Sequence, residues 1–174
     1  MNVALIGHGF WPLVGGLERQ IYDCAVGLSR QGCTVRVLSI IAEGSDLPTD
    51  ELLHLPDGAP IQVHRAPVLQ PAVPVDPLCE PEIPAAAYRQ LAPRWARLLH
   101  DADVLCTFGA SPALAGELVT RRLGLPFVAV LPGIPPQADP RFGEVLRCGA
   151  DLFVGVSRFM CERAATLYDL HMIP

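Results

Sequence analysis

The sequence predicts an α/β fold: a Rossmann-like, doubly wound parallel sheet of about six strands, covered by helices on both faces so that three layers form. Short apolar runs alternate with amphipathic segments of helical period along most of the chain, and this alternation is typical of βαβ units. Several runs are apolar at successive positions, as in parallel strands that are buried on both faces. The length of 174 residues is that of one domain, so we expect a single domain over residues 1–174.

The first predicted unit is a strand, a glycine-bearing loop and a helix. Val3–Gly7 is a continuous apolar run that ends in glycine, which indicates a buried strand. The helix is predicted over Leu17–Gln31, where apolar residues recur every three or four positions, and Gly32 suits a left-handed C-terminal cap. Alternating apolar and polar residues then predict a second strand over Thr34–Ser39 that continues into the next two residues.

The middle of the chain is less regular. A short helix is predicted around Asp50–Leu55 and a third strand over Ile61–Arg65. Pro67–Pro84 holds six prolines in eighteen residues, which excludes a helix or a central strand; it is either a solvent-exposed connection or a segment that meets a ligand or partner. A helix follows over Ala85–His100, and Pro93 is expected to kink or split it.

The second half repeats the alternation of strands and helices. Strands are predicted over Asp103–Phe108, Pro126–Leu131 and Asp151–Val156. Helices are predicted from Ser111–Pro112 to Leu123–Gly124, from Asp139–Pro140 to Cys148–Gly149, and from Ser157 to about Asp169. Serine or aspartate at each start is a good N-cap, and proline is tolerated in a first turn.

The composition disfavours several kinds of chemistry. All thirteen basic residues are arginine, and a chain without lysine has neither a Schiff-base nucleophile nor a phosphate loop of the Walker type. The net charge of −5 disfavours binding to nucleic acid, which requires clustered positive charge. Gly7 and Gly9 lack the third glycine of the dinucleotide fingerprint, which disfavours a nicotinamide cofactor. No run reaches the roughly eighteen apolar residues of a membrane-spanning helix.

The cysteines predict a reducing environment. They lie far apart and form no C-x-x-C pair, so we expect no metal site and interpret them as small buried apolar residues. No signal peptide is expected in front of them, which favours the cytoplasm. The six are Cys24, Cys33, Cys79, Cys106, Cys148 and Cys161.

The loop after the first strand is the expected ligand site. Doubly wound sheets bind ligands at the carboxyl ends of their strands, which places His8, Gly15 and Gly16 at the site. Adjacent glycines at a helix N-terminus let backbone amides approach an anion, although the same pair also fits a tight turn without a ligand. Glu18 either caps amides of its own helical turn or contacts the ligand. His8 either contacts the ligand or satisfies carbonyls of the loop.

Four ordered motifs resemble those of one known family. They are Pro12-x-x-Gly15-Gly16-x-Glu18 with the helix and strand that follow it, Ala102–Leu105, Pro126–Val130, and Gly149–Arg158. Together they are similar to the N-terminal domain of family 4 glycosyltransferases of the GT-B architecture. The similarity spans nearly the whole chain in order, while the stretch from Ile41 to Ala102 carries no motif.

The resemblance implies one half of a two-domain enzyme. In this family the N-terminal Rossmann-like domain mainly binds the acceptor, and the C-terminal domain makes most contacts to the nucleotide-sugar donor. We therefore expect a retaining transfer to an acceptor that is a sugar, a lipid-linked molecule or a small molecule, with no cofactor and no metal. The donor domain is expected to be missing from this chain, which would then be inactive alone. Peripheral contact with a membrane is a further expectation.

The resemblance also extends the expected site to other strand ends. No catalytic residue is assigned, and the expected ligand-binding residues are His8, Gly15, Gly16, Glu18, Gly133, Ser157 and Arg158. Pro132 stands where the family often has a histidine that contacts the sugar near the reacting centre. Because proline has no side-chain donor, this departure indicates either a divergent subfamily or an inactive domain.

Two other classes of function stay open at the level of sequence. A flavodoxin-like binding module would use the same strand ends without transferring a group. An interaction module would use the proline-rich Pro67–Pro84 segment together with an exposed apolar face.

Overall fold

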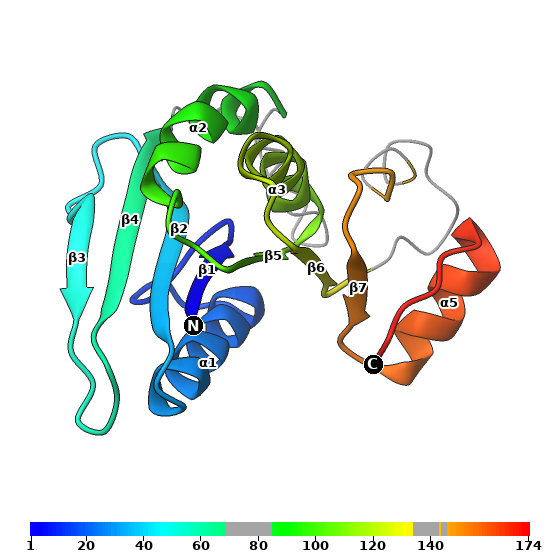
Figure 1. Cartoon of the computed structure of the whole chain (residues 1–174), viewed down its shortest axis with the longest axis horizontal. Helices are drawn as coiled ribbons and strands as arrows, with labels where there is room; N and C mark the ends of the chain where they lie inside the picture. Colours follow the sequence, from blue (N-terminus) through cyan, green and yellow to red (C-terminus); the bar gives the residue numbers. More distant parts are fainter. Residues whose placement is uncertain (69–84, 134–142, 144–145) are drawn as a thin grey trace.

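The computed structural model describes residues 1–68, 85–133, 143 and 146–174. In these parts of the chain, seven strands form one sheet in the order β3-β4-β2-β1-β5-β6-β7 (Figure 1). The strands are β1 Asn2–Ile6, β2 Thr34–Ala42, β3 Asp50–Leu53, β4 Ile61–Val68, β5 Val104–Phe108, β6 Phe127–Leu131 and β7 Leu152–Gly155. The helices are α1 Gly16–Arg30, α2 Ala85–Leu98, α3 Ala110–Leu123 and α5 Arg158–Tyr168.

The strand order identifies the topology. All neighbours except β3 and β4 pair in parallel, so the six predicted parallel strands are confirmed. Numbered among themselves in chain order, these six lie in the order 3-2-1-4-5-6, which is that of the Rossmann fold and differs from the flavodoxin-like order 2-1-3-4-5. The order reverses between β1 and β5, and such a reversal creates a crevice at the carboxyl ends of the strands.

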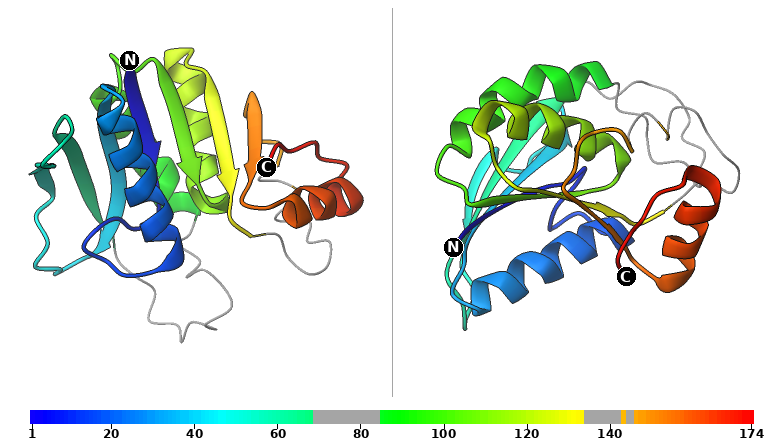
Figure 2. Two further views of the ribbon diagram at one scale, coloured as in Figure 1. Left: turned by 90° about the horizontal axis from the view of Figure 1, so that it is seen from below. Right: turned by 45° about the vertical axis from the view of Figure 1, so that its right-hand side comes forward.

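Helices cover both faces of the sheet. Figure 2 shows α2 and α3 on one side and α1 on the other, so the predicted three layers are confirmed. Beneath α2, the rings of Tyr88 and Trp95 are buried with their centroids 6.1 Å apart. Beneath α1, Ile21 and Ala25 are buried against apolar residues of β1, β2 and β4. Each face therefore has its own hydrophobic cluster, as expected for a sheet whose strands are apolar at successive positions.

The short helix predicted around Asp50–Leu55 is wrong. This stretch forms β3, which pairs antiparallel with β4 in the register Glu51↔Val63 and Leu53↔Ile61. A strand this short has little preference of its own, so pairing with a neighbour decides its conformation. The carboxylate of Asp50 lies 2.6 Å from His64 Nδ1, and this hydrogen bond lowers the pKa of Asp50.

The third strand is longer than predicted. β4 continues through Pro67, which is in register with Ile41 of β2, so the first two residues of Pro67–Pro84 belong to the strand. β3 pairs with β4 only over its first four residues, and β4 is an edge strand beyond them, where proline is tolerated. The rest of that segment, residues 69–84, lies outside the described residues. So does the predicted helix start at Asp139–Pro140.

One prediction about a helix start is wrong, and one about a helix end is confirmed. α3 is capped by Gly109, whose φ of 102° suits glycine, so Ser111 lies inside the first turn and is not the N-cap. α2 runs as one helix through Pro93 to Leu98, so the proline does not split it. α3 ends as predicted at Leu123–Gly124, where Gly124 has the left-handed conformation at φ 68°.

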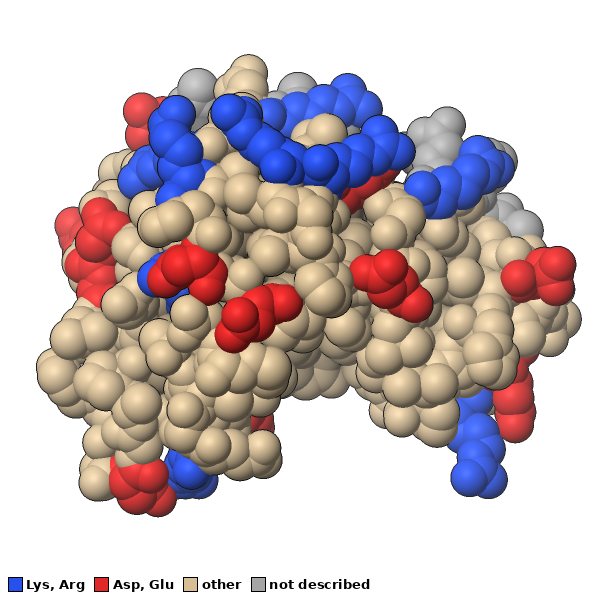
Figure 3. Space-filling model, in the orientation of Figure 1, with Lys and Arg blue, Asp and Glu red and all other residues tan. Residues whose placement is uncertain are grey.

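Arginines gather on the layer formed by α2 and α3. Figure 3 shows basic side chains along the top of the view, over these two helices. The exposed arginines of the two helices are Arg89, Arg94, Arg97, Arg121 and Arg122. Arg97 and the two of α3 lie in last turns, where positive charge complements the helix dipole, and Arg121 also pairs with Glu117 at 2.7 Å. Helix stability therefore accounts for Arg97, Arg121 and Arg122.

We predict that replacing Gly116 of α3 by a larger residue lowers the stability of the fold. A Cβ at this position would lie 2.7 Å from both Phe127 Cζ and Thr107 Cγ2. We expect Gly116→Ala to lower the free energy of unfolding, because overpacking costs about 1–3 kcal/mol and the better helix propensity of alanine recovers only about 1 kcal/mol. The matched change Gly27→Ala in α1, where a Cβ meets nothing within 4 Å, should raise stability by about 0.5–1 kcal/mol. Urea unfolding tests the pair, and shifts of the same sign would contradict it.

Candidate functional site

The loop between β1 and α1 lies at the crevice beside β5. Its first residues are held by backbone hydrogen bonds to β2, from the Gly7 amide to the Leu38 carbonyl at 3.0 Å and from the Ile40 amide to the His8 carbonyl at 3.1 Å. Phe10 is buried and fixes the loop to the core. The loop thus begins in a defined position at the strand end where ligands bind in such sheets.

The two predicted glycines have different roles. Gly15 is the N-cap of α1, and a Cβ there would overlap Glu18 Oε2. At Gly16 a Cβ would meet nothing within 4 Å and the residue is exposed, so the first residue of α1 is open to solvent. The carboxylate of Glu18 also lies close to Gly9, where a Cβ would be 2.9 Å from Oε1. Glycine lets the loop close around Glu18, while the open side at Gly16 leaves amides within reach of a ligand.

Glu18 does not cap its own helical turn in the described residues, where no amide donates to its carboxylate. His8 likewise does not satisfy loop carbonyls there: its Nδ1 lies 3.3 Å from the hydroxyl of Tyr88 on α2. Burial lowers the pKa of His8 from its ordinary value of 6.5, and the opposing effect of Glu18 is smaller. The imidazole is therefore neutral near pH 7.

The lowered pKa of His8 predicts a loss of stability on acidification. Because the unfolded chain takes up a proton at His8 more readily than the folded one, this contribution is complete above pH 6.5 and is lost as the pH falls towards the folded pKa. The slope cannot exceed about 1.4 kcal/mol per pH unit for one group. Proton NMR should show the His8 ring titrating below pH 6.5, and His8→Gln should flatten the pH dependence of urea unfolding. A His8 midpoint at or above 6.5 would contradict this prediction.

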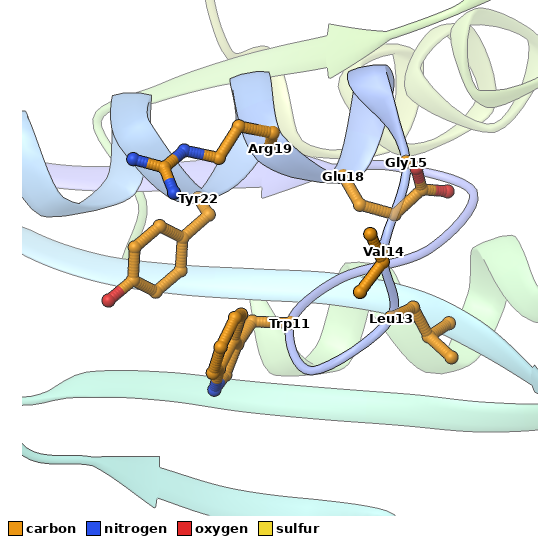
Figure 4. A pocket seen from close by; sticks show the side chains of 7 residues that line it. All are labelled: Trp11, Leu13, Val14, Gly15, Glu18, Arg19 and Tyr22. Atoms are coloured by element: carbon orange, nitrogen blue, oxygen red, sulfur yellow. The ribbon is translucent and has the colours of Figure 1, made fainter.

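A shallow pocket of about 110 Å³ opens on the outer side of the loop (Figure 4). Its aromatic wall is formed by Trp11 and Tyr22, whose ring centroids are 5.5 Å apart. The guanidinium of Arg19 lies 5.8 Å from the centre of the Tyr22 ring and pairs with Asp23 at 2.8 Å. The lining residues are Trp11, Leu13, Val14, Gly15, Glu18, Arg19 and Tyr22. Sequence reasoning did not single out this aromatic wall, because the rings meet only once the loop folds back onto α1.

The other predicted site residues lie further along the same edge of the sheet. Gly133 follows β6 and Ser157 follows β7, two and three strands away from β1, which corresponds to about 10 and 14 Å. Ser157 Oγ accepts a hydrogen bond from the Met160 amide at 3.3 Å, which confirms it as the N-cap of α5. Arg158 is exposed at the first turn of that helix. The structure thus brings His8, the glycines and Glu18 together and leaves the other three residues apart from them.

Arg65 is a further residue at this site that sequence reasoning missed. Its side chain is only 1% exposed, and it donates hydrogen bonds to the Trp11 carbonyl at 2.7 Å, to Glu51 Oε2 at 2.7 Å and to the Pro48 carbonyl at 3.0 Å. The alternation of the strand contained the signal, because Arg65 lies on the same side as the buried Ile61 and Val63. A charged residue on the buried side of a strand is expected to have a buried ion-pair partner.

No group of three or more His, Cys, Asp or Glu side chains among the described residues could hold a metal ion. Burial raises the pKa of the Cys106 thiol to about 11, so this thiol is not a nucleophile near neutral pH. Within the described ranges, no helix is both long enough and apolar enough to cross a membrane.

Solved structures resemble the chain over nearly its full length. A sucrose-phosphate synthase of Thermosynechococcus elongatus superposes with a TM-score of 0.71 at 13% identity, covering 99% of this chain and 47% of that one. A part of the same enzyme gives a TM-score of 0.68 at 12% identity, covering 100% of this chain and 87% of that part. The HepE protein of Anabaena, solved in complex with UDP and glucose, gives 0.57 at 15% identity, with 99% and 43% covered. This chain thus spans less than half the length of the longer structures it resembles.

The sequence comparison identifies the family. No curated protein matches the chain. Glycosyltransferase Family 4 matches over residues 14–174, which is almost the whole chain and includes the double glycine, Glu18 and the last strand and helix. The fold and this match agree with the four motifs that resemble the N-terminal domain of GT-B enzymes. The chain therefore belongs to glycosyltransferase family 4.

Proposed function

We propose that this chain is the acceptor-binding, Rossmann-like half of a retaining glycosyltransferase that takes its sugar from a nucleotide-sugar donor. The observation that carries the proposal is the open N-terminus of α1 at Gly16, beside the crevice between β1 and β5, in a chain of family 4. A second, donor-binding domain is part of the proposal, on the same polypeptide or on a partner chain. Its support is that solved neighbours are more than twice as long as the part that resembles this chain. Without this second domain, the chain would not catalyse sugar transfer.

The loop divides into a part for anions and a part for hydroxyl groups. Backbone amides at Gly16 would donate to the departing diphosphate, on which negative charge develops during transfer. The carboxylate of Glu18 only accepts hydrogen bonds when ionised, which suits sugar hydroxyls and not phosphate oxygens. A neutral His8 adds no charge to either part. Closure of the donor domain over the crevice would exclude the water that otherwise hydrolyses the donor.

The pocket of Figure 4 is the acceptor subsite in this proposal. Small-molecule sites are typically lined by apolar and aromatic side chains with a few polar groups that fix orientation, and the pocket combines Trp11 and Tyr22 with Glu18 and Arg19. Gly133, Ser157 and Arg158 would lie further along the crevice and contact the donor or the second domain. The acceptor is a sugar, a lipid-linked molecule or a small molecule.

We place this activity in the cytoplasm, with peripheral membrane contact if the acceptor is lipid-linked. The support is the spacing of the cysteines and the free thiols of Cys24, Cys33, Cys106, Cys148 and Cys161. Disulfide-dependent folds belong to oxidising compartments.

Titration of the chain with UDP and with pyrophosphate tests the anion part of the site. Two charge-assisted amide hydrogen bonds contribute about 1.5–3 kcal/mol each, or about 3–6 kcal/mol together, and a Kd of about 1 mM corresponds to about 4 kcal/mol. Because association itself costs free energy, we expect a Kd of about 1 mM or higher. In 15N NMR, we expect both ligands to shift the amides of Gly15 and Gly16 and to leave those of β3 unchanged. Shifts confined to another part of the chain, or none at tens of millimolar ligand, would contradict the proposed site.

A further inference from the structure

We propose that Arg65 is a positioning residue for the loop from Gly9 to Gly16: by holding the Trp11 carbonyl it sets where the amides in front of α1 meet a ligand. This inference rests on the proposed function for the identity of the ligand. The contact between Arg65 and the loop does not depend on that identity.

One guanidinium joins three segments that are far apart in sequence. Nη2 of Arg65 donates to the Trp11 carbonyl in the β1–α1 loop and to Glu51 Oε2 on β3, at 2.7 Å each. Nη1 donates to the Pro48 carbonyl in front of β3 at 3.0 Å. Because both hydrogens of Nη2 are used in one plane, Glu51 also fixes the direction in which Arg65 points at the loop.

The loop needs this hydrogen bond because burial of its own side chains holds little of it. Trp11, Leu13 and Val14 are 47%, 42% and 97% exposed. The preceding residue, Phe10, is buried, and a turn connects it to Leu13 through a hydrogen bond of 3.1 Å. Between Phe10 and the start of α1, the buried side chain of Arg65 on β4 holds the loop by its hydrogen bond to the Trp11 carbonyl.

A change in the position of Trp11 would also move Gly15 and Gly16, the glycines proposed to face the ligand. The Trp11 ring packs against Tyr22 of α1, and only three residues separate Trp11 from Gly15. At Gly15 the backbone approaches the Glu18 carboxylate so closely that a Cβ there would displace the carboxylate. A loop released from Arg65 would therefore lose the arrangement of Gly15 and Glu18 as well as its own position.

A matched pair of arginine variants separates positioning of the loop from general support of the fold. Arg36 on β2 is also largely buried, with a side chain 18% exposed, and it joins Gln62 and Asp101 without contacting the loop. In hydrogen exchange of the full chain, Arg65→Met should speed exchange of the protected amides of residues 9–16 about tenfold, the factor for losing one hydrogen bond to a charged group. One such amide is that of Leu13, which donates to the Phe10 carbonyl at 3.1 Å. Arg36→Met should leave those amides at the wild-type rate. Equal exchange in wild type and Arg65→Met, or equal acceleration by both variants, would overturn the proposal.

Glu51→Gln keeps the test decisive if Arg65→Met does not fold. The amide oxygen of glutamine still accepts a hydrogen bond from Arg65 but no longer fixes it by charge, so exchange in residues 9–16 should accelerate to a smaller extent. An unchanged rate in this variant would count against the inference in the same way.

A second measurement uses UDP as the probe and distinguishes the two proposals. UDP should slow exchange of the Gly15 and Gly16 amides in the wild type, with an affinity at least about tenfold weaker in Arg65→Met. If UDP protects neither amide in the wild type, the proposed anion site is wrong, while the comparison of Arg65→Met with Arg36→Met still judges the positioning role. Equal UDP affinity in both proteins, despite a loosened loop, would overturn the link from Arg65 to the ligand.

Discussion

Gly16→Val is expected to slow sugar transfer by the proposed two-domain enzyme about a hundredfold. A Cβ at Gly16 meets nothing within 4 Å, so the variant should fold normally. The two methyl groups of valine would instead occupy the open space in front of the first turn of α1 and keep an anion away from its amides. Because these amides act on charge that develops in the transition state, the loss should appear mainly in kcat.

Gly27→Val is the matched control for this prediction. Gly27 lies on the same helix, a Cβ there also meets nothing within 4 Å, and its distance from Gly16 along the helix axis is about 16 Å. Transfer rates with a nucleotide-sugar donor should therefore equal those of the wild type. If Gly16→Val transfers sugar as fast as Gly27→Val, the amides of the loop are not the anion site.

Glu51→Ala is expected to lower the free energy of unfolding by about 3 kcal/mol. Breaking a buried ion pair by removing one partner costs about 3–5 kcal/mol, and the lower end applies because the Glu51 side chain is 33% exposed and water can enter beside it. The cost arises at Arg65, whose positive charge stays buried at 1% exposure with its carboxylate removed. Urea unfolding of wild type and variant measures the difference.

Two further variants identify the cause of that loss. Asp57→Ala removes the partner of Arg30 from a pair whose side chains are 55% and 59% exposed, and it should cost less than about 1 kcal/mol. The double change Arg65→Met with Glu51→Leu removes both charges and should recover part of the lost stability, since apolar replacements of a buried pair are often neutral. A loss at Glu51 no larger than at Asp57 would show that the buried charge of Arg65 is not what makes Glu51 important.

The parallel strands could be predicted from sequence because local signals mark their ends. Ser157 caps α5 as predicted, Gly32 takes the predicted left-handed conformation just after Gln31, the C-cap of α1, and α3 ends at Gly124. The apolar runs between such helix ends leave little choice but a buried strand. β3 carried no such signal. Asp50–Leu53 has too few residues for a period, and its conformation is decided by pairing with β4, a contact that sequence patterns of this length do not encode.

The residues of the candidate site also fall into some that the sequence could predict and some that it could not. The double glycine and Glu18 could be placed at the mouth of the sheet, because they form one motif on one loop. The partner of His8 comes from α2, eighty positions away, and Arg65 reaches the loop from β4. The contact of Arg65 follows from the strand order, which places β2 beside β1 and β4 beside β2. Neither contact could be derived from the residues that surround the motif.

The two outer strands of the sheet limit how this domain can join another protein. An open edge presents unpaired amides and carbonyls to which a foreign strand can add. At β7 these groups are occupied, because Ile173 accepts from the Gly155 amide at 2.8 Å and donates to the Phe153 carbonyl at 3.0 Å. At the other edge, β3 has only four residues and begins with two acidic ones, which discourages strand addition. The proposed donor domain should therefore contact this one through side chains and loops, so that the two domains could move relative to each other without breaking a shared sheet.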